Sequence, residues 1–307
     1  MDNQEQHTLW LWMEGVFARR ISYFLLMKGL VASTAELLAG RSTATNLSII
    51  RTYPLPPLKW ESEDPNDPPP KHATNPCMRT TNRVTGMSKF VYESTSILLY
   101  LEELYPNPPM QPTSLIGRAH MLDMIGQINL ISIDTNYFLR NTVPEHGMIM
   151  GLNHEDQSRT AALNAKFQEM HGFLKLQTWA QNNGLQSTGW LTPDVDGPGL
   201  VDLALVPNLR FVELVYGIDT LEDNALKPLA EWYKRFKTLS WWSEYEEREG
   251  ILPEMLSFGK TSRAPWSSNL CIAVEERNVS LTETDLAQVD EENRCVFAPI
   301  ADSDSSA

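Results

Sequence analysis

The fold is decided by the stretch Asn75–Tyr105, which reads NPCMRTTNRVTGMSKFVYESTSILLYLEELY. Its first half predicts two short strands joined by a polar turn that closes on Gly86, with Pro76 at the entry to the first strand. Its second half predicts an amphipathic helix that begins after Ser94, because apolar residues recur there at helical spacing. Strand, turn, strand and helix in this order make up half of a thioredoxin-like unit.

Glu93 and Ser94 stand where the second of these strands meets the helix. The N-terminus of a helix leaves backbone N–H groups unpaired and carries a partial positive charge, so it suits a carboxylate ligand. Ser94 also suits an ordinary N-cap, which stabilises a helix by about 1 kcal/mol. A cap and an anion site use the same donors, so the sequence is compatible with both roles at once.

The residues before this stretch predict the other half of the unit. A strand at 9–13 is broken by Glu14 and Gly15, and a helix at 16–29 follows, with Gly29 at its C-terminal cap. A second strand lies near 47–53. Residues 54–70 then hold seven prolines among charged residues. Prolines this dense exclude a helix and predict an extended, exposed loop.

Together these features resemble the glutathione-binding half of the cytosolic glutathione S-transferase superfamily. The resemblance rests on the proline before a strand, on the Glu-Ser pair at the head of the helix and on the ILLYLEELYP that follows. The sequence is similar to a filamentous-fungal branch whose members often serve secondary-metabolite pathways. The resemblance covers roughly residues 8–256, and it implies a thioredoxin-like domain at 8–106, a linker at 107–114 and an all-helical domain at 115–258.

The second half of the chain fits this division. Amphipathic patterns predict helices at 115–141, 156–182, 200–216 and 225–239. Asp202, three residues after Gly199, is expected to bond back to the backbone at the start of the third of these helices, without the reciprocal bond of a capping box, because Gly199 has no hydroxyl. Residues 259–307 lose the apolar period and carry nine acidic against four basic residues, so they predict a disordered acidic tail. The expected architecture is α/β plus all-α.

Composition narrows the class of function. The chain of 307 residues has a formal net charge of −14 and a pI of about 4.9, which argues against a nucleic acid or an anionic membrane as partner. No apolar run approaches the ~20 residues that span a bilayer, and the polar start MDNQEQHT is unlike a secretory signal. Three scattered cysteines do not form a disulfide framework, and the six histidines show no metal-ligand spacing. We therefore expect a cytoplasmic protein without a metal.

The resemblance implies glutathione as co-substrate and assigns its contacts. A cis bond between Asn75 and Pro76 would present the Asn75 backbone to the cysteinyl part of glutathione, as an added strand would. Ser94 would take the γ-glutamyl carboxylate through its hydroxyl and N–H, and Glu93 would take the ammonium. The family helix that touches the glycine end is replaced here by residues 54–70. Candidates for the glycyl carboxylate are therefore Lys59, Trp60, Lys71 and His72.

The catalytic position is where this chain departs from the family. Glutathione transferases lower the pKa of the glutathione thiol with a Tyr, Ser or Cys after the first strand, whereas this loop reads Met-Glu-Gly-Val-Phe from position 13. Three accounts stay open. The backbone N–H groups of Gly15 and Val16 stabilise the thiolate, or Glu14 acts as acid or base on the second substrate, or activity has been lost. Glu14 as a mere helix-start carboxylate is equally compatible with the sequence.

Two arginines and one cysteine remain as candidates for a role in the site. Arg19 and Arg20 face different sides of the first helix, so one could reach the carboxylates of a ligand, although a solvated arginine on a helix face is the commoner case. Cys77, on a central strand, is expected to be a small buried apolar residue rather than a nucleophile.

The function that the resemblance implies is glutathione-dependent conjugation or isomerisation of an electrophilic, apolar small molecule in fungal secondary metabolism. The alternative is a catalytically silent protein that keeps the fold as a ligand carrier or interaction module. A third option is a glutathione-independent enzyme that uses Glu14 as acid or base. The sequence leaves the substrate and the oligomeric state open, a homodimer included.

Overall fold

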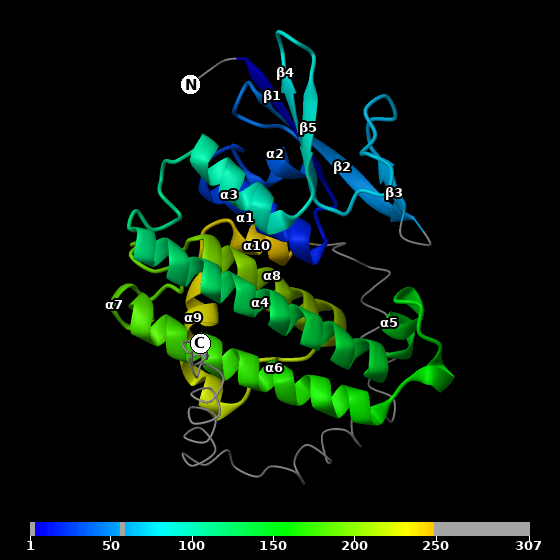
Figure 1. Ribbon diagram of the computed structural model, residues 1–307, viewed down its shortest axis with the longest axis vertical. Helices are drawn as coiled ribbons and strands as arrows, with labels where there is room; N and C mark the ends of the chain where they lie inside the picture. The colour runs from blue at the N-terminus through cyan, green and yellow to red at the C-terminus, as the bar shows by residue number, and fades with distance from the viewer. Residues whose placement is uncertain (1–3, 56–58, 249–307) are drawn as a thin grey trace, which may run out of the picture. The chain divides into compact units, whose positions relative to one another are not determined.

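The computed structural model describes residues 4–55 and 59–248 of the chain. Its described strands form one sheet in the order β3-β2-β1-β4-β5 (Figure 1). Strand β1 (Glu5–Leu11) pairs in parallel with β2 (Leu47–Leu55) and antiparallel with β4 (Cys77–Asn82). Strands β5 (Ser88–Val91) and β3 (Lys59–Ser62) pair antiparallel at the two edges. The order of the inner strands is the one that the thioredoxin-like prediction requires.

The two faces of the sheet are covered differently. Leu9 and Leu11 of β1 join the main hydrophobic core, whereas Trp10 between them points to the other face, where it packs with Cys77. The Trp10 indole N–H donates to the Asp67 carbonyl at 2.9 Å. This bond places Asp67, in the proline-rich segment, against the second face of the sheet.

Helices α1 (Val16–Met27) and α3 (Ser94–Leu104) lie between the sheet and the helical half (Figure 1). The C-terminus of α1 is closed by Gly29, whose φ of +65° only glycine adopts readily, and by a hydrogen bond of 2.9 Å from the Leu30 N–H to the Leu25 carbonyl. The predicted cap is thus confirmed. The short helix α2 (Thr34–Leu38), which was not predicted, is N-capped by Ser33, whose hydroxyl oxygen accepts from the Glu36 N–H at 3.2 Å.

The second half of the described chain is helical. Its long helices are α4 (Leu115–Thr142), α6 (Arg159–Ala180) and α8 (Leu200–Tyr216), with α4 beside α6 and α8 against both α1 and α4. These three match the predicted patterns. Shorter elements join them: α5 (Pro144–Ile149), η1 (His154–Asp156), η2 (Gln181–Leu185), α7 (Gln186–Thr188), η3 (Asn224–Leu226), α9 (Lys227–Phe236) and α10 (Trp242–Glu246).

Two predictions need comment. The segment 54–70 was predicted to be an extended loop, but its proline-free residues Lys59–Ser62 form β3, which pairs with the end of β2. The acidic tail at 259–307 and the last ten residues of the predicted helical domain lie outside the described residues. The boundaries 8–106 and 115–258 stay a prediction, since the described residues all belong to one compact body. None of the described helices combines the length and apolar composition needed to cross a bilayer.

Candidate active site

The loop between β1 and α1 forms the first part of the candidate site. Gly15 is the N-cap residue of α1, and its own N–H donates to the Trp12 carbonyl at 2.9 Å. A side chain at this position would place its Cβ 2.6 Å from the Trp12 ring, so only glycine fits the turn. Of the two backbone donors in the first of the three accounts, the Gly15 N–H already has an acceptor within the turn. Val16 is the first residue of α1, where a backbone N–H has no partner within the helix, and its role stays a prediction.

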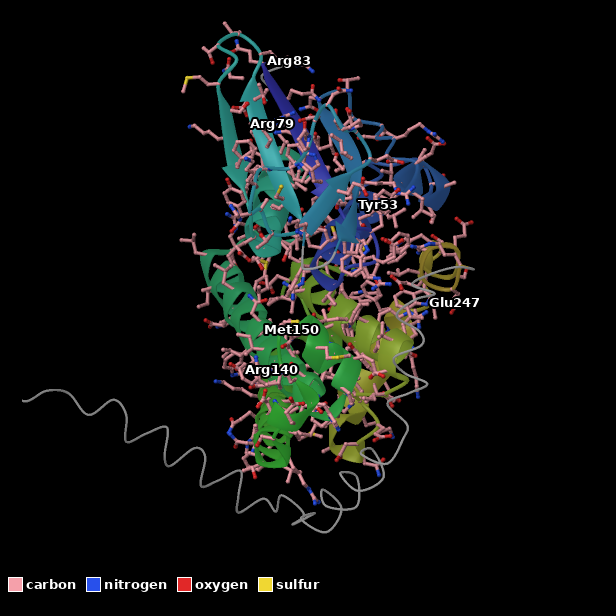
Figure 2. The ribbon with its side chains drawn as sticks, turned by 90° about the vertical axis from the view of Figure 1, so that its right-hand side faces the viewer. Tyr53, Arg79, Arg83, Arg140, Met150 and Glu247 are labelled. Carbon is pink, nitrogen blue, oxygen red and sulfur yellow. The ribbon has the colours of Figure 1, made fainter. Side chains whose placement is uncertain are left out.

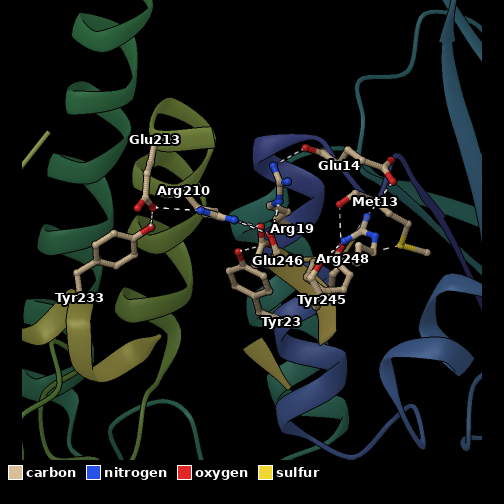
Figure 3. A network of polar contacts seen from close by, with 11 residues as sticks. Met13, Glu14, Arg19, Tyr23, Arg210, Glu213, Tyr233, Tyr245, Glu246 and Arg248 are labelled. Carbon is tan, nitrogen blue, oxygen red and sulfur yellow. Dashed lines mark hydrogen bonds and ion pairs between the residues drawn. The ribbon is translucent and has the colours of Figure 1, made fainter. Parts of the chain in front are cut away.

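Glu14 is held by the C-terminal end of the described chain. The Arg248 guanidinium donates to the Glu14 carboxylate at 3.0 Å, and the Arg19 guanidinium donates to the Glu14 carbonyl at 2.5 Å (Figure 3). The Tyr245 hydroxyl donates to the Met13 carbonyl at 2.7 Å. The carboxylate at position 14 is thus one half of an ion pair rather than an isolated charge.

Behind this loop lies a buried polar cluster, the Glu246 network, made of Arg19, Tyr23, Arg210 and Glu246 (Figure 3). The Glu246 carboxylate, which is fully buried, accepts from Arg19 at 3.0 Å, from the Tyr23 hydroxyl at 2.6 Å and from Arg210 at 3.2 Å. Burial and the Glu246 charge raise the pKa of Tyr23 well above its ordinary value. The network joins α1, α8 and α10, so it anchors the helix whose N-terminus faces the candidate site.

Asn75 and Pro76 form the second part of the site. The Asn75–Pro76 bond is cis, as predicted. The Asn75 side chain ties this turn to the sheet: its amide oxygen accepts from the Trp12 N–H at 2.8 Å, and its amide nitrogen donates to the Thr52 hydroxyl at 2.8 Å. These bonds use only the side chain of Asn75, and the role of its backbone toward a ligand stays a prediction.

Glu93 and Ser94 form the third part. Glu93 is the N-cap residue of α3, with extended backbone and without a side-chain bond to the helix, and its carboxylate is exposed. Ser94 is buried as the first residue of the helix. The Thr74 hydroxyl donates to the Tyr92 carbonyl at 2.9 Å. The cis-proline turn is therefore bonded both to the loop before α1 and to the entry of α3, so the three predicted parts meet.

Arg20 also lies in this site, although the sequence alone did not decide its role. It lies on α1 with 1% of its surface exposed, and one terminal nitrogen is 3.2 Å from the Asn129 amide oxygen and 3.4 Å from the Ser94 hydroxyl oxygen. Arg19, its neighbour in sequence, turns instead to the Glu246 network. Neither arginine is solvated, contrary to one of the expectations for this pair.

Aromatic side chains line the site beside Trp12. The Trp12 ring lies 5.8 Å from the Trp60 ring. Trp12 also packs against the buried residues Leu139, Val143, Val212, Val215 and Tyr216, and so do Phe138, Phe211 and Leu214. The side chains of Trp12, Phe138, Phe211 and Leu214 are only partly buried. Trp12 thus links the loop before α1 to apolar residues at the end of α4 and in α8.

Both halves contribute exposed apolar side chains to one face of the molecule. On the face shown in Figure 2, Tyr53 lies among the strands, whereas Met150 and Arg140 lie among the helices. Tyr53 is 37% exposed and Met150, which follows α5, is 42% exposed. The Arg140 guanidinium stacks on the Tyr137 ring at 3.9 Å, so it is not a free cation on this face.

The other candidates are placed as follows. Trp60 joins the aromatic surface, while Lys59, Lys71 and His72 are exposed around the proline-rich segment. Cys77 is fully buried, and burial raises the pKa of its thiol to about 12. A thiol this hard to ionise is not a nucleophile, which agrees with the prediction. Among the described residues, no group of His, Cys, Asp and Glu is arranged to hold a metal ion.

The comparisons with known proteins bear on the fold. No protein-family profile and no curated protein sequence matches the chain. Among solved structures, the chain is similar to a glutathione transferase family member from Pseudomonas fluorescens Pf-5 with bound S-(propanoic acid)-glutathione (TM-score 0.54, 13% identity, 78% of this chain and 99% of the other). It is also similar to FzlA from C. crescentus (0.52, 15%, 82% and 99%).

A third similar structure is the maleylacetoacetate isomerase from Anaeromyxobacter dehalogenans 2CP-1 with glutathione bound in its active site (TM-score 0.50, 19% identity, 81% of this chain and 99% of the other). Nearly the whole of each of these proteins is matched, so both halves of the architecture are shared. Identities this low speak for the fold alone. The chain has the fold of the glutathione transferases: a thioredoxin-like half joined to a helical half.

Proposed function

We propose that this protein is a glutathione-dependent transferase or isomerase that acts on an electrophilic, apolar small molecule. The observation that carries the proposal is the meeting of three separate segments at one place: the N-terminus of α1, the Asn75–Pro76 turn and the entry of α3. The bonds from Trp12 to Asn75 and from Thr74 to Tyr92 bring them together. Each segment offers a different kind of group, and glutathione has a matching group for each.

The residues present fit the ligand in charge and hydrogen bonding. The first-turn N–H groups of α3 and the Ser94 hydroxyl suit the γ-glutamyl carboxylate, and the exposed Glu93 carboxylate suits the ammonium. The Asn75 backbone N–H and C=O suit the cysteinyl backbone. When bound, glutathione supplies the thiol that attacks the electrophile. Lys59, Trp60, Lys71 and His72 stay the candidates for its glycyl end.

Activation of the thiol falls to the N-terminus of α1. With the Gly15 N–H used by the turn, the Val16 N–H and the partial positive charge of the helix are the groups proposed to stabilise a thiolate there. Arg248 offsets the charge of Glu14, which would otherwise raise the pKa of a neighbouring thiol. Glu14 stays a candidate acid or base for the second substrate.

The second substrate is proposed to bind against Trp12, Phe138 and Phe211, whose partly buried rings favour an apolar, flat molecule. The sequence resemblance adds the proposal that this molecule belongs to fungal secondary metabolism and that the protein works in the cytoplasm. The aromatic surface suits conjugation and isomerisation equally.

Calorimetry with glutathione tests the proposal, with Ser94→Ala as the probe of the ligand position. Losing a hydrogen bond to a charged group costs about 1.5–3 kcal/mol, so affinity should fall about tenfold or more. Ser96→Ala is the matched control, because Ser96 is exposed in the same turn of α3. Equal affinity in Ser94→Ala and the wild type would remove the assignment of Ser94.

The alternative is a catalytically silent protein that carries a ligand or docks a partner. It is favoured by one observation: the loop from Trp12 to Val16 offers no hydroxyl or thiol, and the Gly15 N–H is taken. Turnover of a generic aromatic electrophile in the presence of glutathione separates the two. Binding of glutathione without turnover of this or any other electrophile would favour the silent protein.

A further inference from the structure

The described part of the proline-rich segment, residues 59–70, is tied to the middle of the sheet by Asp67. The Asp67 carboxylate accepts two hydrogen bonds of 2.7 Å from the guanidinium of Arg79 on β4, a residue labelled in Figure 2. The Asp67 carbonyl accepts from the Trp10 indole at 2.9 Å and from the Ser62 hydroxyl at 3.2 Å. A two-bond pair between a guanidinium and a carboxylate fixes orientation as well as distance. Asp67 therefore holds this segment in one position.

The Asp67–Arg79 pair contributes position rather than stability. The two side chains are 30% and 25% exposed, so solvent weakens their attraction and the pair adds little to the free energy of unfolding. Arg79 is oriented from below by the Trp10 ring, over which it stacks at 5.1 Å, and by the Thr8 hydroxyl at 3.1 Å. A surface pair fixed in this way explains where the segment lies, and the question is what the segment presents.

Strand β3 carries Trp60 from this segment to the candidate site. It pairs with the end of β2, where Pro54 stands opposite Trp60. Side chains two apart in a strand share a face, and so do side chains opposite each other in a ladder, so Trp60 lies on the face of Thr52. The Thr52 hydroxyl accepts from the Asn75 side chain at 2.8 Å. The Trp60 ring lies 5.8 Å from the Trp12 ring, with the two planes tilted by 40°.

Trp12 and Trp60 together form an aromatic corner beside the loop that leads to α1. Both side chains are only partly buried, so each keeps apolar surface that a ligand can cover. Their tilt excludes face-to-face stacking of one ring on the other. Trp12 precedes Met13 and Glu14, so the corner lies next to the place proposed for the thiol.

We propose that the 59–70 segment sets the specificity of the site, with Trp60 as the residue that contacts the second substrate and Asp67 as the residue that positions Trp60. This rests on the proposed function. The substrate class is a planar aromatic electrophile, because an aromatic ring gains more against tryptophan than its buried area alone provides. The glycyl end of glutathione is then left to Lys59, Lys71 and His72.

Binding of three ligands to the wild type and to Trp60→Leu tests the contact. The ligands are glutathione, S-hexylglutathione and S-(para-nitrobenzyl)glutathione, which differ only in the group on sulfur. Trp60→Leu should weaken the nitrobenzyl derivative about three- to tenfold more than the hexyl derivative and leave glutathione unchanged. Trp60→Phe, which keeps an aromatic ring, should restore most of this difference. An equal loss for all three ligands would place Trp60 against glutathione itself and overturn the proposal, and so would the absence of any loss.

The same ligands test the positioning role through Asp67→Asn. Asparagine keeps the size of the side chain and the carbonyl that Trp10 uses, but it removes the charge that holds Arg79. This variant should lose part of the preference for the nitrobenzyl derivative at unchanged affinity for glutathione. Asp64→Asn, at an exposed position of the same segment, is the matched control and should bind like the wild type.

Wild-type binding by Asp67→Asn would overturn the positioning role of Asp67. A loss of affinity for all three ligands in this variant would overturn it as well, because the segment would then act on the whole site rather than on the substrate. If the wild type binds none of the three ligands, the proposed function fails, and the specificity proposal falls with it.

Discussion

At the scale of single residues, the charge at position 14 decides how a thiol could ionise in this site. Glu14 follows directly on the buried Met13, and its carboxylate lies 3.0 Å from the Arg248 guanidinium. Both side chains are partly exposed, so solvent weakens the pair, and its contribution to stability is small. The effect of this ion pair on the local electrostatic potential is larger. With Arg248 in place, the N-terminus of α1 lies beside a neutral ion pair rather than beside an uncompensated carboxylate.

Replacement of this carboxylate is expected to raise activity. Glu14→Ser removes the anion, leaves the Arg248 cation beside the site and adds a hydroxyl donor to the thiolate. All three changes lower the pKa of the thiol. Conjugation of a generic aromatic electrophile should rise several-fold, to about tenfold if the new hydrogen bond forms fully. The measurement is the rate at saturating glutathione as a function of pH.

Glu14→Gln is the control for this prediction, because it removes the charge without adding a hydroxyl. It should give part of the gain. If Glu14 is instead the acid or base for the natural substrate, both variants should lose the native reaction while glutathione affinity stays nearly intact. Unchanged generic and native rates would contradict both roles and favour the silent protein.

Features of the site could be predicted from the sequence where they depend on residues nearby in the chain. The placement of Ser94 at a helix start could be predicted because it depends on a few neighbouring residues, whereas the cis bond at Pro76 was implied by the family resemblance. The partner of Glu14 could not be predicted, since Arg248 lies 234 positions away. The use of the Gly15 N–H in a turn was missed although it is local, since its acceptor, the Trp12 carbonyl, lies three residues before it.

At the scale of elements, a single carboxylate organises the entry of α8. Asp202 is fully buried, and within the described chain it accepts from the Gly199 N–H at 2.9 Å, from the Thr192 hydroxyl at 2.8 Å and from the Trp232 indole at 2.7 Å. The Thr192 hydroxyl in turn accepts from the Val201 N–H at 3.0 Å. The hydroxyl that Gly199 lacks is thus supplied from the preceding loop, which the sequence prediction missed.

Loss of this carboxylate should be among the costliest single changes in the protein. Asp202→Ala leaves several buried N–H and O–H groups without an acceptor, and such losses cost about 3–5 kcal/mol in total. Urea unfolding should show this as a lower midpoint with an unchanged slope. Asp196→Ala, at an exposed position in the same loop, should change the free energy of unfolding by less than about 0.5 kcal/mol. Similar effects of the two changes would contradict the role given to Asp202.

Element prediction succeeded where periodicity was long. Helices α3, α4, α6 and α8 each show several turns of apolar spacing, and their positions were predicted to within a few residues. Short elements such as α2, α5 and α10 hold too few turns to show a period. Strand β3 was not predicted, because it is a short strand at the edge of the sheet between prolines that exclude a helix. Its pairing with β2 is a tertiary contact that the sequence does not display.

At the scale of the whole molecule, a half-buried histidine ties three helices together. His146 of α5 lies 2.6 Å from the Tyr216 hydroxyl of α8 through Nδ1 and 3.4 Å from the Asn136 amide of α4 through Nε2. Burial, with a smaller contribution from the Arg140 charge, lowers the pKa of His146 from 6.5 to about 4. The folded protein therefore favours the neutral form of the His146 imidazole.

The free energy of unfolding should consequently depend on pH through the protonation of His146. Between pH 6.5 and about 4, the unfolded chain binds a proton at His146 that the folded chain does not, so the free energy of unfolding falls as the pH drops through this window. The His146 contribution is fully present above pH 6.5 and fully lost below about 4. At about 1.4 kcal/mol per pH unit, the loss amounts to as much as about 3 kcal/mol.

His146→Gln isolates this contribution from the carboxylates that titrate in the same range, because glutamine can bond to Tyr216 but does not take up a proton. Urea unfolding at pH 7 and pH 4 should show a smaller acid-induced loss in the variant than in the wild type, by as much as about 3 kcal/mol. His154→Gln, on the exposed η1, is the control and should follow the wild type. Equal acid-induced losses in the wild type and His146→Gln would mean that α4, α5 and α8 accommodate a charged imidazole between them.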